Sequence, residues 1–287
     1  MSELTLAQIK AQLMPGRLKG VKRIIAVASG KGGVGKSTVA ANLALALKQH
    51  GMQVGLLDAD IYGPSQPLML GVETGKQPEQ AGEQGFEPII AQGIQTMSMG
   101  YLVSESTPMV WRGPMASGAL QQLLFQTHWQ NIDYLIIDMP PGTGDIQLTL
   151  AQKVPVDGAL IVTTPQDIAL LDAKKAIEMF AKVHVPILGL VENMAIHVCT
   201  ECGHQEAIFG EGGGARMAEM YHTQVLAQIP LTKALRMEMD QGTPTVVARP
   251  EGIEAKTFLS LAESCVRTLW QQEQLAEQMP EIIVSED

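Results

Sequence analysis

The stretch "RIIAVASGKGGVGKSTVAANLALAL", residues 23–47, decides the fold of this chain. An apolar run leads into Gly30–Ser37, which fits the pattern G-x-x-x-x-G-K-[ST], and a helical pattern follows. The glycines let successive backbone N–H groups face phosphate oxygens, and the start of a helix adds partial positive charge. Lys36 is placed to reach the β- and γ-phosphates, and the Ser37 hydroxyl to bind Mg²⁺. The candidate nucleotide contacts are Gly30, Lys31, Gly32, Gly33, Val34, Gly35, Lys36, Ser37 and Thr38.

Further along the chain, short apolar runs alternate with helical patterns. The runs cover residues 53–59, 133–139, 158–164, 187–193 and 224–230, with a less regular one near 93–102, and the helical patterns cover 37–51, 115–129, 168–183 and 255–279. Near-continuous apolar strands of this kind are typical of a parallel sheet that is buried on both faces. No internal repeat or compositional break divides the chain. We therefore expect one α/β domain around a mostly parallel sheet.

The composition limits the classes of function. Of the 287 residues, 46% are hydrophobic, which is enough for a sizeable core, and the net charge is −10. An acidic chain argues against a broad surface for nucleic acid or anionic lipid. No run of about 18 apolar residues marks a membrane span, and residues 1–20 lack the basic start and apolar block of a secretory signal. These features favour a cytoplasmic protein that binds neither nucleic acid nor membrane.

Two acidic segments stand at the ends of predicted strands. Asp58 and Asp60 end the run that begins at residue 53, and Asp138 ends the run that begins at residue 133. Open parallel sheets bind ligands at these strand ends, and carboxylates hold Mg²⁺ there, often through water. Each aspartate taken singly also suits a helix cap. Their coincidence with the phosphate loop predicts a Mg²⁺ site.

Two of the three cysteines form Cys199-x-x-Cys202, flanked by His197 and His204, while Cys265 falls in a predicted helix and is expected to fill the core. The two histidines and two cysteines are residue types that bind zinc. Four ligands within eight residues, however, are poorly spaced to surround one ion as a tetrahedron. A redox pair or a disulfide is a further alternative. A [4Fe–4S] cluster held by cysteine alone needs four thiolates, and two copies of the chain would supply them.

Lys31, directly after the first glycine of the loop, gives the chain its first resemblance to a known group. A second lysine here resembles the deviant phosphate loop of the MinD, ParA, arsenite-pump and nitrogenase iron-protein families. The resemblance implies a three-layer P-loop NTPase fold and ATP hydrolysis, with Lys31 crossing a homodimer interface to the partner's nucleotide. It also implies that Asp60 orients the attacking water. Asp138 would be the Walker B carboxylate for magnesium, and Asp58 would support the magnesium shell.

The same resemblance assigns the base end of the nucleotide. Asn193 and Pro230 stand where related ATPases border the adenine, and the preference for ATP over GTP is likewise implied by the resemblance. The segments "DADIYGPS" and "DMPPGTGD" correspond to the two switch regions that sense the γ-phosphate.

A closer resemblance rests on six segments in a fixed order. They are "GKGGVGKST", "LLDADIYGPSQP", "WRGPM", "IIDMPPGTGD", "ENM" and "CTECGH". Over roughly residues 20–270 this order resembles the Mrp/ApbC iron–sulfur cluster carrier family. The resemblance implies a slow ATPase whose homodimer binds a [4Fe–4S] cluster through Cys199 and Cys202 of both subunits. It also implies donor proteins that supply the cluster and acceptor apoproteins that receive it.

The expected organisation is a short extension over residues 1–20, a single ATPase domain with the cysteine segment over 21–277, and a flexible acidic tail over 278–287. The polar stretch 73–88 is expected to be a mobile excursion. Many relatives carry a further domain, and some a four-cysteine motif, ahead of the first strand. Here about twenty residues without cysteine precede it, so we expect no second stable cluster.

The main alternative function is a regulatory or positioning ATPase like MinD or ParA, with a structural zinc at the cysteines. Such proteins need a basic amphipathic helix for membrane or a basic face for DNA. The last residues, "QQEQLAEQMPEIIVSED", are acidic instead. The sequence therefore favours the carrier.

Overall fold

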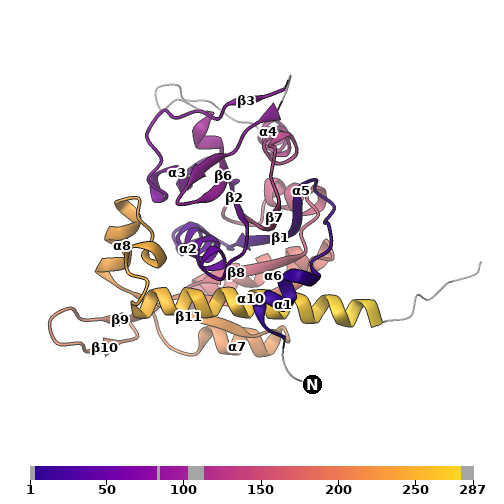
Figure 1. Cartoon of the computed structure of the whole chain (residues 1–287). Helices are drawn as coiled ribbons and strands as arrows, with labels where there is room; N and C mark the ends of the chain where they lie inside the picture. The colour runs from indigo at the N-terminus through magenta and orange to yellow at the C-terminus, as the bar shows by residue number, and fades with distance from the viewer. Residues whose placement is uncertain (1–3, 83–84, 103–112, 279–287) are drawn as a thin grey trace, which may run out of the picture.

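The computed structural model describes residues 4–82, 85–102 and 113–278, in which a central sheet lies between two layers of helices (Figure 1). The strands of this sheet are β1 Val21–Ala28, β2 Val54–Asp58, β5 Ile89–Ala91, β6 Ile94–Ser98, β7 Ile132–Asp138, β8 Gly158–Thr163, β9 Ile187–Val198, β10 Gln205–Glu206 and β11 Val225–Leu231. Their order is β10-β9-β8-β1-β7-β2-β6-β5, with β11 also paired to β9. All described pairs in this sheet are parallel except β5–β6 and β9–β10.

Helices cover both faces of the sheet. One face carries α1 Leu6–Gln12, α2 Lys36–Gln49, α8 Lys233–Asp240, α9 Thr245–Ala248 and α10 Ile253–Gln278. The other face carries α4 Gly113–Gln126, α5 Asp145–Lys153, α6 Asp167–Lys182 and α7 Gly213–Met220. The short helices α3 Gln66–Met69 and η1 Met99–Tyr101 follow β2 and β6. The predicted three-layer α/β fold with a mostly parallel sheet is confirmed.

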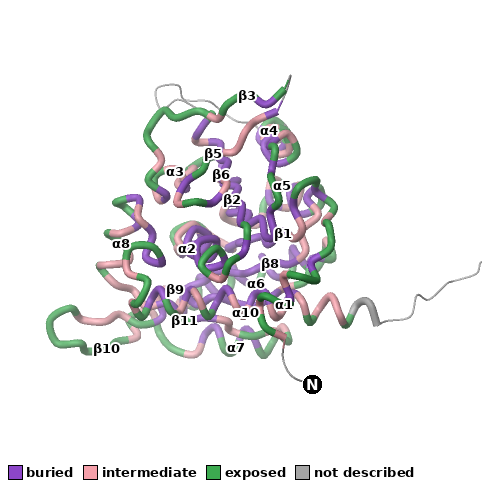
Figure 2. The backbone as a smooth tube through the Cα atoms, in the orientation of Figure 1, coloured by how far each residue is buried: buried purple, intermediate pink, exposed green. Residues whose placement is uncertain are grey.

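The two faces of the sheet explain why its strands are apolar throughout. In β1, Ile25 and Val27 enter the core under α2 and α10, whereas Ile24 and Ala26 enter the core under α4 to α6. Successive side chains of a strand point to opposite faces, so a strand covered on both sides needs an apolar residue at every position. Buried residues accordingly run through the centre of the molecule, with exposed ones around it (Figure 2).

The parallel register brings the predicted acidic residues together. Asp58 pairs with Asp138 across β2 and β7, and Asp138 also pairs with Val27 of β1. The phosphate loop follows β1 and leads into α2. The loop and both aspartates therefore lie at the same edge of the sheet, where the carboxyl ends of three neighbouring strands meet.

Some elements differ from the expectations. β9 continues through residue 198, five residues past the predicted run, because its last part pairs with β10 rather than entering the buried sheet. Within the stretch 73–88, β3 Gln80–Ala81 and β4 Gly85–Phe86 form a small antiparallel pair. The short helices α5, α7 and α8 were also not predicted. The "WR" of "WRGPM" (111–112) and the tail residues 279–287 lie outside the described part of the chain.

The predicted N-terminal extension contains α1, which packs against the domain. Thr5 and Gln8 cap its start reciprocally, and Ile9 is 1% exposed in the core under α2 and α10. Lys10 Nζ lies 3.2 Å from Asp133 Oδ2 at the start of β7. The predicted domain boundaries themselves stay predictions. Within the described ranges, no helix has the length and apolar character needed to cross a membrane.

Candidate functional site

The predicted phosphate loop borders a hollow of about 200 Å³. Gly33 and Gly35 have φ angles of 81° and 82°, a backbone conformation that favours glycine. A Cβ added at Gly33 would meet no atom within 4 Å, so this part of the loop faces open space. The hollow is lined by Ser29, Lys31, Gly32, Gly33, Gly35, Lys36, Ser37, Thr38, Asp60, Met69 and Pro141. The structure thus joins most of the predicted loop residues to Asp60 around one cradle.

Lys36 forms an ion pair with Asp138 at the bottom of this site. Both side chains are buried, with 5% and 0% of their surface exposed, and Lys36 Nζ also donates to Ser37 Oγ over 3.2 Å. Buried charges are tolerated when they are paired and hydrogen-bonded. Lys36 must exchange this carboxylate for phosphate oxygens to play its predicted role.

Asp58 fixes the segment that follows β2. Its Oδ2 accepts hydrogen bonds from the backbone N–H groups of Ser65 and Gln66 and from Ser98 Oγ, and its Oδ1 accepts one from Asp60 N. Burial, followed by the nearby charge of Asp138, raises the pKa of Asp58 to about 7. This carboxylate therefore shapes the first predicted switch segment. Its role in the magnesium shell stays a prediction.

Asp60 is the aspartate that reaches the hollow. Burial raises its pKa, although the charge of Lys36 opposes the shift, and its Oδ1 accepts a hydrogen bond from Gly63 N over 3.3 Å. A carboxylate beside the phosphate cradle suits the predicted task of orienting a water. That role also stays a prediction.

The residues at the bottom of the site fit a magnesium ion. The Ser37 hydroxyl and the Asp138 carboxylate, the two predicted ligands, carry oxygen atoms, the type of ligand that Mg²⁺ requires. Gln66 Nε2 donates to Ser37 O over 2.9 Å and to Asp138 Oδ2 over 2.8 Å, while the Oε1 of the same amide is buried without a hydrogen-bond partner. Buried polar atoms are nearly always paired with protein or water, so this oxygen has an unused capacity to accept a hydrogen bond.

Asn193 lies behind the loop rather than in the hollow. Its Nδ2 donates to Val34 O over 2.8 Å, and a Cβ at Gly35 would come within 2.1 Å of Nδ2. Pro230, half-buried in β11, follows Ile229, which pairs with Asn193. Neither Asn193 nor Pro230 lines the hollow, and their predicted contact with adenine stays a prediction.

The cysteine segment forms the turn between β9 and β10, a hairpin that projects from the body of the molecule (Figure 1). Cys199 N donates to His204 O, and Gly203 N donates to Cys199 O, both over 2.9 Å. Cys199 is half-exposed, Cys202 is exposed, and both are free thiols. Backbone N–H groups of Cys202 and Glu201 hydrogen-bond to the sulfur of Cys199 and lower its pKa. The turn thus presents two free thiols, of which Cys199 has a lowered pKa.

The third cysteine is remote from this turn. Cys265 lies in α10, is fully buried, and burial raises its pKa to about 12. The predicted role of Cys265 as a core residue is confirmed. Across residues 4–82, 85–102 and 113–278, no three or more His, Cys, Asp or Glu side chains are grouped as a metal site within one chain.

One strand joins the two candidate sites. Asn193 contacts the phosphate loop, and Cys199 follows six residues later, about 20 Å along an extended strand. Between them, Met194 has a φ of 56°, where the pairing of β9 with β11 becomes irregular. The loop contact at Asn193 and the cysteine hairpin are thus joined by a short, continuous piece of backbone.

The sequence as a whole identifies the family. Residues 20–266 match the family model described as "ParA: NUBPL iron-transfer P-loop NTPase". The chain belongs to this family. This P-loop NTPase is 58% identical over 265 residues to the "Iron-sulfur cluster carrier protein" of Pseudomonas fragi, with 92% of each chain covered. It is 48% identical over 266 residues to the "Iron-sulfur cluster transfer protein NUBPL" of Mus musculus, which covers 91% of this chain and 83% of the mouse protein.

Solved structures agree with the family. A nucleotide-binding protein from Archaeoglobus fulgidus, determined in complex with ADP, is 38% identical with a TM-score of 0.72 and covers 89% of this NTPase and 98% of its own chain. The cell division ATPase MinD of Pyrococcus furiosus is 25% identical with a TM-score of 0.63, covering 88% and 99%. The predicted resemblance to cluster carriers with a MinD-like fold is confirmed.

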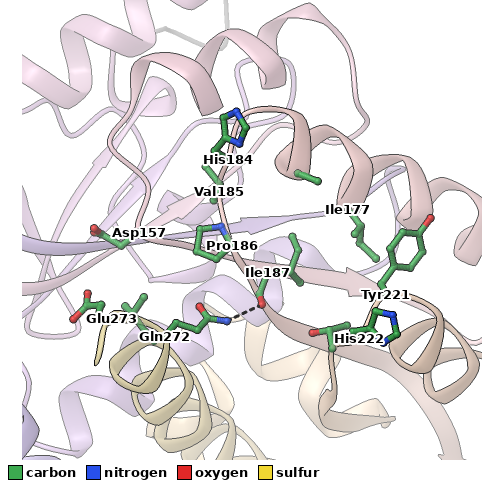
Figure 3. Close-up of a pocket in the computed structure, with 13 residues that line it drawn as sticks. Asp157, Ile177, His184, Val185, Pro186, Ile187, Tyr221, His222, Gln272 and Glu273 are labelled. Atoms are coloured by element: carbon green, nitrogen blue, oxygen red, sulfur yellow. Dashed lines mark hydrogen bonds between the residues drawn. The ribbon is translucent and has the colours of Figure 1, made fainter. Parts of the chain in front are cut away.

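A second, larger hollow of about 740 Å³ lies at the other end of the strands (Figure 3). It is bordered by the starts of β8 and β9, the ends of α6 and α7, and the C-terminal part of α10. Gln272 Nε2 donates to Ile187 O there over 3.2 Å. None of the predicted site residues of this NTPase lines that hollow.

Sequence reasoning missed two buried polar residues near the site. Gln66 stands inside the quoted "GPSQP", where an uncharged polar residue between prolines carries no motif signal. Glu192, 2% exposed, precedes Asn193 and accepts hydrogen bonds from Gly214 N and Gln228 Nε2 over 2.9 and 2.6 Å. Glu192 thereby ties α7 and β11 to the strand that carries the cysteines.

Proposed function

We propose that this NTPase is an ATP-dependent iron–sulfur cluster carrier that binds a [4Fe–4S] cluster between two copies of the chain and transfers it to apoproteins. The observation that carries the proposal is the projecting turn with two free thiols, which directly follows the strand that contacts the phosphate loop. The names of the relatives, a cluster carrier and a cluster transfer protein, agree with it.

The count of thiols supports a shared cluster. One chain offers Cys199 and Cys202 at its surface, whereas Cys265 is enclosed in the core. A [4Fe–4S] cluster with cysteine ligands takes four thiolates, so two turns facing each other provide a full set. Exposed thiolates on projecting hairpins also leave the cluster accessible to donor and acceptor proteins.

Lys31 supports the pairing of two chains around nucleotide. It lines the phosphate hollow and is partly exposed, and its backbone oxygen accepts a hydrogen bond from Ser29 Oγ over 2.9 Å. We place its ammonium across the interface, at the nucleotide of the partner subunit. Positive charge delivered there stabilises the charge that develops on the transferred phosphoryl group.

The remaining site residues divide the work of slow ATP hydrolysis. Lys36 leaves Asp138 and binds the phosphates. Ser37 and Asp138 hold the cation, with support from Asp58. Asp60 orients the attacking water. Magnesium, when bound, neutralises phosphate charge. Asn193 and Pro230 border the adenine. Because Asn193 is bonded to Val34 of the loop, nucleotide turnover would reach Cys199 through β9.

Anaerobic reconstitution with iron and sulfide tests the carrier. The native protein is expected to become brown and to hold one [4Fe–4S] cluster per two chains, measured by iron and sulfide content, absorption and molar mass. Cys199→Ser is expected to remain colourless, because each dimer loses two of four ligands, yet to bind ATP normally. Cys265→Ala serves as the matched control and should load fully.

Two outcomes would contradict the proposal. A brown, fully loaded Cys199→Ser protein would exclude this residue as a ligand. Zinc alone at one ion per chain, with no cluster after reconstitution, would instead favour the regulatory ATPase with a structural metal. The cytoplasmic location stays a prediction.

A further inference from the structure

Gln66 connects the three segments that form the bottom of the nucleotide site. Its backbone N–H donates to Asp58 Oδ2 over 3.1 Å. Its side-chain Nε2 donates to Ser37 O over 2.9 Å and to Asp138 Oδ2 over 2.8 Å. Only 1% of the residue is exposed. A single side chain therefore bridges the phosphate loop and the end of β7, while its backbone is bound to the end of β2.

The other half of the same amide has no partner. Gln66 Oε1 is buried, and no donor in the described part of the chain reaches it. The orientation of the amide is fixed, because both partners of Nε2 are oxygens that only accept. Turning the amide over would place oxygen against oxygen at both contacts. The amide oxygen is therefore left as an open acceptor for a water or a ligand group.

The hydrogen-bond partners of Asp138 show when the orientation of this carboxylate depends on Gln66. Among the described residues, Lys36 bonds to Asp138 Oδ1, and Gln66 Nε2 bonds to Oδ2. Once Lys36 turns toward phosphate, Gln66 is the remaining side chain that orients this buried carboxylate. A cation held there keeps several of its waters, and each such water is a hydrogen-bond donor.

We propose that Gln66 is the positioning residue for the cation of this nucleotide site. Its Nε2 holds Asp138 in place, and its Oε1 accepts a hydrogen bond from a water that accompanies Mg²⁺. The inference rests on the proposed nucleotide function and adds to it a residue outside the phosphate-loop motif.

The test measures the affinity of Mg²⁺ for the complex of the protein with ADP. Titrating Mg²⁺ into that complex separates cation binding from nucleotide binding. Gln66→Leu removes both amide contacts at nearly constant volume and is expected to weaken Mg²⁺ binding about tenfold, the effect of one hydrogen bond near a charged group. A purely structural role for Gln66 would lower the melting temperature of the protein without changing this affinity.

Gln92→Leu is the matched control. Gln92 Nε2 likewise bridges two oxygens, Leu70 O over 3.2 Å and Gly242 O over 3.1 Å, but outside the site. Its loss should leave Mg²⁺ affinity within twofold of the native protein, even if the melting temperature falls. Equal weakening in both variants would overturn the inference, because it would mark a general loss of structure.

A measurement on the native protein keeps the test independent of the variants' folding. The side-chain amide resonances of Gln66 should shift when Mg²⁺ is added to the ADP complex, and unchanged resonances would overturn the inference. If the native protein binds ADP with no effect of Mg²⁺, the proposed nucleotide chemistry itself fails. If the native protein shows that effect and Gln66→Leu retains it in full, only the role of Gln66 fails.

Discussion

Lys36 belongs to the phosphate-loop motif, but its ion-pair partner, Asp138, lies outside that motif. The sequence assigns Lys36 to phosphate and Asp138 to magnesium, and the structure pairs the two charges in a buried position. Removing one member of such a pair leaves an uncompensated charge, which costs about 3–5 kcal/mol. In the proposed function, nucleotide binding replaces this pair by giving phosphate to the lysine and a cation to the aspartate.

Cys199 is expected to react with iodoacetamide well before Cys265. Hydrogen bonds to its sulfur lower the pKa of Cys199 from the ordinary 9.0, and the thiolate is the reactive form. Its rate of alkylation should therefore rise at lower pH than the rate of an ordinary thiol. Burial raises the pKa of Cys265 to about 12, so it should react only after unfolding.

Peptide mass spectrometry of the metal-free, reduced protein over pH 6–9 measures these rates, with the urea-unfolded protein as the control. Alkylation of Cys265 in the native protein at a rate similar to Cys199 would contradict the burial of α10.

At the scale of elements, the phosphate loop is held by close packing of backbone. A Cβ at Gly30 would come within 2.0 Å of Asp172 C and O in α6. A Cβ at Gly35 would collide with Asn193 of β9. Glycine is thus needed in this loop because α6 and β9 approach its backbone closely. This requirement is separate from the contact of the loop with phosphate.

Two alanine substitutions test whether packing against α6 constrains the phosphate loop. Gly30→Ala is expected to lower the free energy of unfolding by about 2–3 kcal/mol, because α6 must move to make room. Gly32→Ala meets only Pro141 Cβ at 3.9 Å and should change stability by less than about 0.5 kcal/mol. Urea unfolding followed by circular dichroism compares the two, and equal losses would show that α6 does not constrain the loop.

On the scale of the whole molecule, β9 joins the phosphate loop to the cysteine turn. The strand passes the phosphate loop at Asn193 and ends at the turn that holds Cys199. Glu192 fastens α7 and β11 to the same strand. Closing two copies around nucleotide would therefore also set the distance between their two cysteine turns.

Lys31→Ala tests the pairing of two chains. ATP and Mg²⁺ should convert the native protein to a dimer that releases phosphate, whereas the variant should fall to background hydrolysis, because it lacks the charge offered across the interface. Its affinity for ADP as a monomer should stay within about threefold, less than the effect of one hydrogen bond near a charged group. Light scattering and phosphate release measure the two effects.

Lys76→Ala, at an exposed position away from the loop, is the control and should behave as the native protein. Full ATPase activity of Lys31→Ala would refute the assignment of this lysine to the partner's nucleotide.

The sequence by itself determined the phosphate loop, the buried parallel strands and the cysteine turn. Each of these is a local pattern: glycine spacing between a strand and a helix, continuous apolar runs, and two thiols three residues apart. Local periodicity reports the type of an element and its burial, so the α/β fold follows from it. The roles expected for Lys31, Asp60 and Asn193 came instead from the resemblance to known families. The second half of β9 escaped prediction, because its partner β10 has two exposed residues without an apolar pattern.

Tertiary structure alone decided which of these residues touch. The contacts of Asp138 with Lys36 and Gln66 span 102 and 72 residues, and that of Asn193 with Val34 spans 159. They depend on β7 lying between β1 and β2, and on β9 lying beside β8. Strand order follows from packing the whole chain at once, so no local pattern encodes the carboxylate that holds Lys36 or the amide oxygen that Gln66 leaves free.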